Sequence, residues 1–158
     1  MGTIHELCAR NDVNALYAFL DEKDVDNNGE PANFDRYRAA FYIAAKYDNL
    51  PVLKHAMAKL DPVQDVTVPF YDAITQNSTA CFMFLLSHPT LDVMHQNGVF
   101  FKHAIHQNHL RMLARLCCHR TANLDDPFLH TCIEYAATHK NYPAAVFLEA
   151  FITPVIPK

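Results

Sequence analysis

Histidine is the residue type whose number and spacing in this chain could most readily support chemistry. Ten histidines occur among 158 residues, and His103, His106 and His109 form an H-x-x-H-x-x-H series, with His139 further along the chain. Two imidazoles on one helix face can bind zinc, but a catalytic site needs a third ligand and a nearby carboxylate base. His109 follows a predicted turn and need not share the face of His106. We interpret these residues as surface histidines and predict no metal site.

The five cysteines match neither a redox motif nor a zinc knuckle. Two of them are adjacent, so the C-x-x-C spacing of both kinds of site is absent. Their number is odd, and three fall on apolar helix faces. We therefore expect reduced thiols in an intracellular protein and not a disulfide framework. The five residues are Cys8, Cys81, Cys117, Cys118 and Cys132.

An acidic segment, residues 21–35, contains the opening of a calcium-binding loop. Residues 24–29 match the pattern D-x-[DN]-x-[DN]-G. The twelfth position is Asp35, whose side chain is shorter than the glutamate that normally binds calcium through both oxygens. A solvated connection is the expected structure of this segment.

Composition and motifs exclude several classes of function. No G-x-S-x-G, glycine-rich phosphate loop or H-E-x-x-H is present, so we predict no enzymatic activity and no cofactor. The net charge is −4 and no stripe of Lys and Arg occurs, which argues against nucleic acid as a partner. No apolar run approaches the roughly 18 residues that a membrane helix needs. The N-terminus lacks a signal-peptide pattern, so a cytoplasmic location is expected, in the producing cell or in a host cell.

The elements that must position these side chains recur along the chain. An apolar pattern of helical period, interrupted by a short polar turn, occurs five times. When one turn residue is taken as the anchor of each copy, successive anchors are 36, 29, 31 and 32 residues apart. The anchors are Asp12, Asp48, Asn77, Asn108 and Lys140.

Positions counted from these anchors are apolar in nearly every copy. Residues five and eight after the anchor include Tyr17 and Leu20 in the first copy and predict the buried stripe of a second helix. Asn and Asp tolerate the left-handed backbone on which a helix often ends, so the anchors predict a turn between two short helices. Small apolar residues stand four positions before the anchor, namely Cys8, Ala44, Ala73, Ala104 and Ala136.

Capping patterns predict where helices begin. Pro51 and Pro143 suit the first turn of second helices, where the missing N–H does no harm. The expected N-caps of these helices are Asn49, Ser78 and Asn141.

Two further patterns concern the first helices and the connections. The segments 3–6 and 131–134 have capping-box spacing and predict the start of first helices. The Asn-Gly pairs at 28–29 and 97–98 predict hairpin tips in the connections between repeats.

A pair of short antiparallel helices, a longer connection with a hairpin tip and a period near 32 residues together resemble the ankyrin repeat. The segment LLSHPTLDV is similar to the end of an ankyrin second helix with its following turn. The resemblance covers residues 3–150. The family's Thr-Pro-Leu-His opening is reduced to Val-Pro-Phe-Tyr at residues 68–71, and its turn glycine is absent.

The fold class that this resemblance implies is all-α, a solenoid of about five ankyrin-like repeats in one domain, with another α-solenoid as the alternative. The five pairs are expected to stack in sequence order. Repeat boundaries are predicted near residues 3–30, 37–66, 67–97, 98–127 and 128–152, with a tail at 153–158.

The resemblance also implies a concave groove lined by the first helices, one, two and five residues before each anchor. This surface mixes polar, aromatic and aliphatic side chains, as protein-binding faces do. Tyr47, Ile43 and Tyr135 are the expected anchors for a partner. The candidate binding residues are Arg10, Ile43, Lys46, Tyr47, Asp72, Gln76, His103, His106, Gln107, Tyr135 and His139.

The predicted function is non-catalytic binding of a partner protein. Arrays this divergent resemble viral and bacterial effectors that act on host proteins, so a host-directed role is one form of the hypothesis. Two alternatives stay open. One is a metal-dependent or cryptic enzyme that uses the histidine-rich fourth repeat, and the other is a structural subunit of a larger assembly.

The last predicted helix is apolar on more than one face. One neighbouring repeat buries a single stripe, so Phe147 or Phe151 is expected to lack cover within the stack. We expect the tail 153–158 to cover this surface, and a homodimer through the C-terminal repeat is the alternative.

Overall fold

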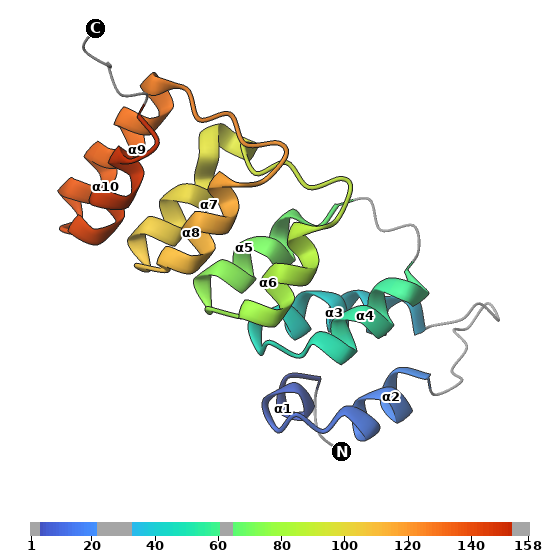
Figure 1. Ribbon diagram of the computed structural model, residues 1–158. Coiled ribbons are helices and arrows are strands. Elements are labelled where there is room, and N and C mark those ends of the chain that lie inside the picture. Colours follow the sequence, from blue (N-terminus) through green and yellow to red (C-terminus); the bar gives the residue numbers. More distant parts are fainter. Residues whose placement is uncertain (1–3, 22–32, 61–64, 153–158) are drawn as a thin grey trace, which may run out of the picture. The chain divides into compact units, whose positions relative to one another are not determined.

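The computed structural model describes residues 4–21, 33–60 and 65–152, and every regular element in these ranges is a helix (Figure 1). The predicted all-α class is therefore confirmed for this part of the chain. The chain divides into two compact units, residues 1–91 and residues 92–158. Each unit is described on its own below.

The first unit contains three helical hairpins arranged in two layers. First helices contact first helices, because α3 packs against both α1 and α5, and second helices contact second helices, because α4 packs against both α2 and α6. Neighbouring hairpins in this unit therefore pack side by side in sequence order (Figure 1). The helices are α1 (Ile4–Ala9), α2 (Val13–Asp21), α3 (Asn33–Lys46), α4 (Leu50–Lys59), α5 (Thr67–Thr75) and α6 (Thr79–Leu86).

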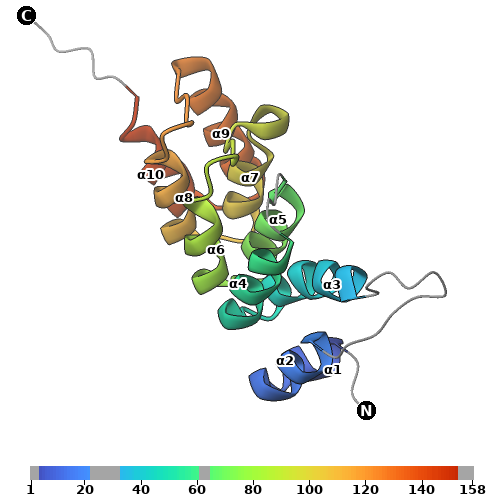
Figure 2. The same ribbon diagram turned by 90° about the vertical axis from the view of Figure 1, so that its right-hand side faces the viewer.

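The second unit contains two hairpins of the same kind. Its first helices, α7 (His95–His106) and α9 (Asp126–Thr138), pack against each other. Its second helices, α8 (Leu110–Cys117) and α10 (Tyr142–Glu149), form the other layer. Figure 2 shows α8 and α10 to the left of α7 and α9.

Every described hairpin turns on one residue with left-handed backbone. At Asp48, for example, φ is 54°, and the next N–H, that of Asn49, donates to the Ala44 carbonyl at 2.9 Å. This is the hydrogen bond of a Schellman motif, which satisfies a carbonyl that the helix end would otherwise leave unpaired. Positive φ at Asn77, Asn108 and Lys140 confirms the other predicted turns from the second hairpin onward.

The first hairpin shows that the predicted anchor was wrong by one residue. The left-handed residue is Asn11, with φ 55°, and not Asp12. The Asp12 side chain accepts a hydrogen bond from the Ala15 N–H at 3.1 Å, which makes it the N-cap of α2. Asn11 and Asp12 are adjacent and either type tolerates left-handed backbone, but aspartate is also a strong N-cap. The shift moves Leu16, which is fully buried, into the column that Tyr17 was predicted to occupy.

The predicted column of small residues lies in the core. Ala44, Ala73, Ala104 and Ala136 are between 0% and 1% exposed. Residues of this size let the two helices of a hairpin approach closely. Larger side chains fill the space between neighbouring helices. In α5 and α6, the rings of Phe70 and Phe82 stack with centroids 5.0 Å apart, and each buried Phe contributes about 1.5–3 kcal/mol.

The predicted N-cap residues of the second helices stand at N-cap positions, but not all of their side chains make a capping hydrogen bond. The Asn49 side chain accepts from the Val52 N–H at 3.4 Å, as predicted. Ser78 and Asn141 also stand at N-cap positions, but their side chains make no capping bond. Instead they donate to the preceding hairpin of the same unit. Ser78 Oγ bonds the Lys46 carbonyl at 3.4 Å, and the Asn141 amide bonds the Ile105 carbonyl.

The predicted capping box at 131–134 is wrong. Helix α9 begins at Asp126, and the Asp125 side chain caps it by accepting from the Phe128 N–H at 2.9 Å. Thr131 lies inside the helix, where its hydroxyl donates to the Pro127 carbonyl. An aspartate cap followed by a proline in the first turn gives an earlier start than the capping box does.

The Asn-Gly pair at 97–98 is not a hairpin tip. Gln96, Asn97 and Gly98 all have positive φ and form a left-handed turn near the beginning of α7. A Cβ atom on Gly98 would lie 2.5 Å from the Phe128 ring, so the glycine lets that ring approach the backbone. The pair at 28–29, most of the acidic segment 21–35 and the tail 153–158 lie outside the described residues.

Candidate functional site

The eleven predicted binding residues fall into two groups, one in each unit. All of them lie on the first helices or on the residue that follows, and each is exposed or half-buried. The first group consists of Arg10, Ile43, Lys46, Tyr47, Asp72 and Gln76. The second consists of His103, His106, Gln107, Tyr135 and His139.

The first group is centred on Tyr47, directly after α3. Its side chain is 43% exposed, one of the most exposed large apolar residues described. His5 from α1 lies beside it, with Nδ1 3.4 Å from the hydroxyl oxygen and ring centroids 6.0 Å apart. An aromatic pair thus joins two neighbouring first helices at this surface.

Lys46 and Asp72 continue this group from α3 onto α5. Partial burial raises the pKa of the Asp72 carboxyl, and the positive charge of Lys46 opposes that rise. The first group thus carries charges of both signs, with Arg10 and Lys46 positive and Asp72 acidic. Such a surface favours a partner of mixed character over a strongly charged one.

The second group is a cluster of aromatic rings at the ends of α7 and α9. The rings of His106 and His139 meet edge to face with centroids 5.3 Å apart. His139 also packs against Tyr135 at 4.1 Å, and its Nδ1 lies 2.8 Å from the Tyr135 carbonyl oxygen. Burial, together with the charge of His106, lowers the pKa of His103. The neutral form of His103 is therefore favoured at this surface.

The histidine series does not assemble into a metal centre in the part of the chain described. No three His, Cys, Asp or Glu side chains among those residues are placed to share an ion. His109 stands at the N-cap position of α8, beyond the turn that follows α7, and burial lowers its pKa.

The corrected register changes the residues that the first hairpin contributes. One, two and five positions before Asn11 stand Arg10, Ala9 and Glu6. In this register Arg10 occupies the position in the first hairpin that Tyr47 occupies in the second. Glu6 is the residue that the sequence argument missed.

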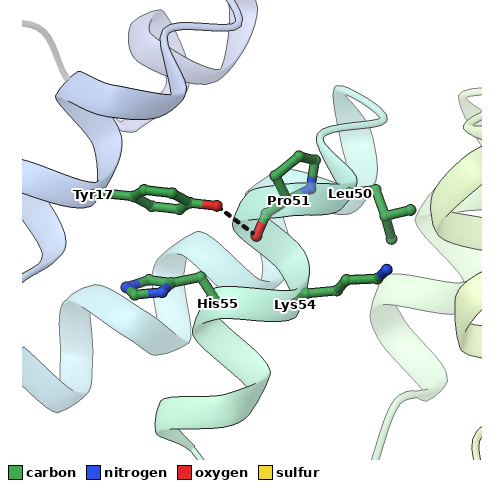
Figure 3. Close-up of a pocket in the computed structure, with 5 residues that line it drawn as sticks. All are labelled: Tyr17, Leu50, Pro51, Lys54 and His55. Atoms are coloured by element: carbon green, nitrogen blue, oxygen red, sulfur yellow. Dashed lines mark hydrogen bonds between the residues drawn. The ribbon is translucent and has the colours of Figure 1, made fainter.

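A pocket that the sequence did not indicate lies on the other layer of the first unit (Figure 3). Its volume is about 520 Å³, and it is a shallow depression that is largely open to solvent. We call it the α4 pocket, and it is lined by Tyr17, Leu50, Pro51, Lys54 and His55. With Asp12 as the anchor of the first hairpin, the sequence pattern predicts Tyr17 in the core and gives no sign of the pocket. The Tyr17 hydroxyl instead reaches the Pro51 carbonyl at 3.3 Å.

A polar cluster supports one wall of the α4 pocket. Asp21 accepts hydrogen bonds from the Tyr37 hydroxyl and from His55 Nε2, the latter at 2.9 Å. The bond from Tyr37 and the neighbouring His55 hold the pKa of the Asp21 carboxyl below its usual value, although partial burial opposes them. The Tyr17 ring packs against His55 with centroids 4.5 Å apart and 39° between the ring planes. The imidazole is therefore held between a carboxylate and an aromatic ring.

All five cysteines are free thiols, as predicted. Four are buried, and burial raises their pKa values, to about 11 for Cys8 and Cys132 and to about 12 for Cys81 and Cys117. Cys118 is exposed.

No protein-family model matches the chain, and no curated protein shows significant sequence similarity to it. Among the described residues, every helix is too short or too polar to cross a bilayer.

Proposed function

We propose that this chain is a non-catalytic interaction module and that it binds a partner protein through the ends of its first helices. We further propose that its hairpins are divergent ankyrin-like repeats. The observation that carries the proposal is that every predicted binding residue is accessible while the apolar columns beside them are buried. The module would act in the cytoplasm, and a host-directed role is the form suggested by the divergence of the repeats.

Aromatic residues give this surface its capacity for affinity. Tyrosines dominate many binding hot spots, because they bury a large area and keep a polar tip. Tyr47 stands exposed next to His5, and Tyr135 packs against His139. Each unit therefore presents one tyrosine beside an imidazole, with charged or amide side chains around it.

The pairing of His106 with His139 is the observation that favours the alternative of a metal-dependent activity. Two imidazoles from neighbouring helices with centroids 5.3 Å apart could share one ion. They would still need further ligands and a base, so we rank this function second. A role as a structural subunit of a larger assembly is the third alternative.

Site-specific photocrosslinking tests the proposed function. A benzophenone amino acid replaces Tyr47 in one sample and Tyr142 in a matched control. Tyr142 is also an exposed tyrosine, 60% accessible, but lies on α10 in the other layer. We expect a defined adduct from position 47 in lysate of the producing or host cell and none of the same mass from position 142.

A quantitative comparison follows once the adduct is identified. Tyr47→Ala should weaken binding of the captured protein by about 2 kcal/mol, the size of a hot-spot truncation. Tyr142→Ala should leave the affinity unchanged. Equal effects of the two substitutions, or equal crosslinking from both positions, would reject the first-helix surface as the binding site.

A further inference from the structure

The α4 pocket lies on the second-helix layer of the first unit, whereas the proposed binding residues of that unit lie on its first helices or directly after them. Four of its described lining residues come from α4, and the fifth, Tyr17, comes from α2. In Figure 3, Tyr17 and His55 lie on one side of Pro51. Leu50 and Lys54 lie on the other side. Pro51 thus forms the middle of a short groove.

The two ends of this groove differ in chemistry. At one end the Tyr17 ring covers His55, so that end offers an aromatic face and an imidazole. At the other end Leu50 offers an apolar side chain beside the Lys54 ammonium. The Lys54 Nζ also lies 5.3 Å from the centre of the Phe84 ring on α6. A cation over an aromatic face is attracted to it, so the ammonium is held near the groove.

The charges of the groove favour an anionic group. Lys54 is positive, and His55 is already bound through Nε2 to Asp21. The carboxylate of Asp21 accepts bonds from both Tyr37 and His55, so its negative charge is engaged on the far side of the imidazole. The His55 Nδ1 is not used by that bond. Lys59, from the end of α4, adds a positive charge near Asp21.

We propose that the α4 pocket binds an extended segment of a protein, with an acidic side chain at Lys54 and a neighbouring apolar side chain against Tyr17 and Pro51. A pocket of about 520 Å³ accommodates two side chains of this size. A folded nucleic acid is a poorer occupant, because the described residues that line the groove include one lysine and phosphate backbones need several cations. This site is separate from the first-helix surface and does not depend on it.

Two tetrapeptides serve as probes, and neither requires the natural partner to be known. Acetyl-Glu-Leu-Glu-Leu-amide carries the proposed chemistry, and acetyl-Gln-Leu-Gln-Leu-amide has the same shape without the charge. Each is titrated into the full chain labelled with ¹⁵N while amide chemical shifts are followed. We expect the acidic peptide to shift the amides of Tyr17, Lys54 and His55, with little change from the neutral peptide.

Variants then test the role of the lysine. Lys54→Met should weaken binding of the acidic peptide about threefold to fivefold, the upper range for one exposed ion pair. Lys54→Gln, which removes the charge but keeps a polar side chain, should give a similar loss. Arg115→Met is the matched control, because it removes one positive charge from an exposed position on α8. It should leave the affinity unchanged.

Several outcomes would overturn the proposal. Equal shifts from both peptides would show that the groove does not distinguish acidic from neutral side chains. Equal losses from Lys54→Met and Arg115→Met would show a general electrostatic effect. If sodium acetate produces the same shifts at the same concentration, the groove is an anion site in which the peptide's apolar residue has no role. Acidic-peptide shifts confined to other residues would place the site elsewhere.

Discussion

His55 Nε2 lies 2.9 Å from the Asp21 carboxylate and thereby joins the end of α2 to the middle of α4. Tyr37 from α3 donates to the same carboxylate. Three helices from two neighbouring hairpins therefore meet at one acidic side chain, directly behind the wall of the α4 pocket.

Asp21→Asn is expected to lower the free energy of unfolding at pH 7 by about 1 kcal/mol or less, because the carboxylate is partly exposed and solvent screens its interactions. The pKa of Asp21 is lowered in the folded state. Its contribution is therefore present above the unfolded pKa of about 3.9 and is lost as pH falls through the folded pKa. Urea denaturation at pH 7 and at about pH 2.5 measures this difference.

At the lower pH the variant and the parent should approach equal stability. Asp126→Asn, an exposed aspartate in the first turn of α9, is the control for a general effect of removing one negative charge. A deficit in Asp21→Asn that is the same at both pH values would contradict a role for the ionised carboxylate.

Gly98→Ala should destabilise the second unit by about 2 kcal/mol or more, because left-handed strain and overpacking add. The new Cβ would meet the Phe128 ring at 2.5 Å, and φ at this position is 82°. Thermal unfolding followed by circular dichroism measures the loss. Adding Phe128→Leu should recover part of it by making room. If Gly98→Ala unfolds like the parent, the close approach of the ring is incorrect.

Lys140→Gly should raise the free energy of unfolding by about 0.5–1 kcal/mol. Lysine pays a steric cost at φ 60°, whereas glycine adopts this backbone freely. The same substitution at Lys102, inside α7, should instead cost about 1 kcal/mol, because glycine is a poor helix former. Chemical denaturation of both variants provides the comparison. A loss of stability in Lys140→Gly would argue against the left-handed turn.

Thiol alkylation should separate Cys118 from the other four cysteines. The buried thiols have pKa values raised to about 11 or 12, so they contain almost no thiolate at pH 8. Iodoacetamide at this pH should add one group to the native protein, at exposed Cys118, and all five in urea. Intact-mass and peptide analysis identify the sites. Rapid native labelling of Cys117 or Cys132 would show that the core of the second unit opens easily.

Much of the helical pattern could be predicted because buried positions and left-handed turns each favour particular residue types. The alanine column at residues 44, 73, 104 and 136 is small, apolar and buried. The turns at Asp48, Asn77 and Asn108 use the types that best tolerate left-handed backbone without glycine.

Errors arose where two residues near the same helix end were each suited to the same role. Asn11 and Asp12 are both suited to left-handed backbone, and only the capping bond to Ala15 decides between them. Asp125 and Thr131 are both reasonable N-caps, and the structure uses the earlier one. The α4 pocket depends on contact between α2 and α4, which local patterns do not encode.

The hydrogen bonds from Ser78 to the Lys46 carbonyl and from Asn141 to the Ile105 carbonyl run from the start of a second helix to the end of the first helix in the preceding hairpin. A substitution that removes one of these hydrogen bonds should therefore affect a helix that lies earlier in the sequence than the substituted residue. A substitution at Asn141 removes a partner from α7, so fraying is expected at the end of that helix, more than thirty residues upstream. The third and the fifth hairpin thus each stabilise the end of a helix in the hairpin that precedes them within the same unit.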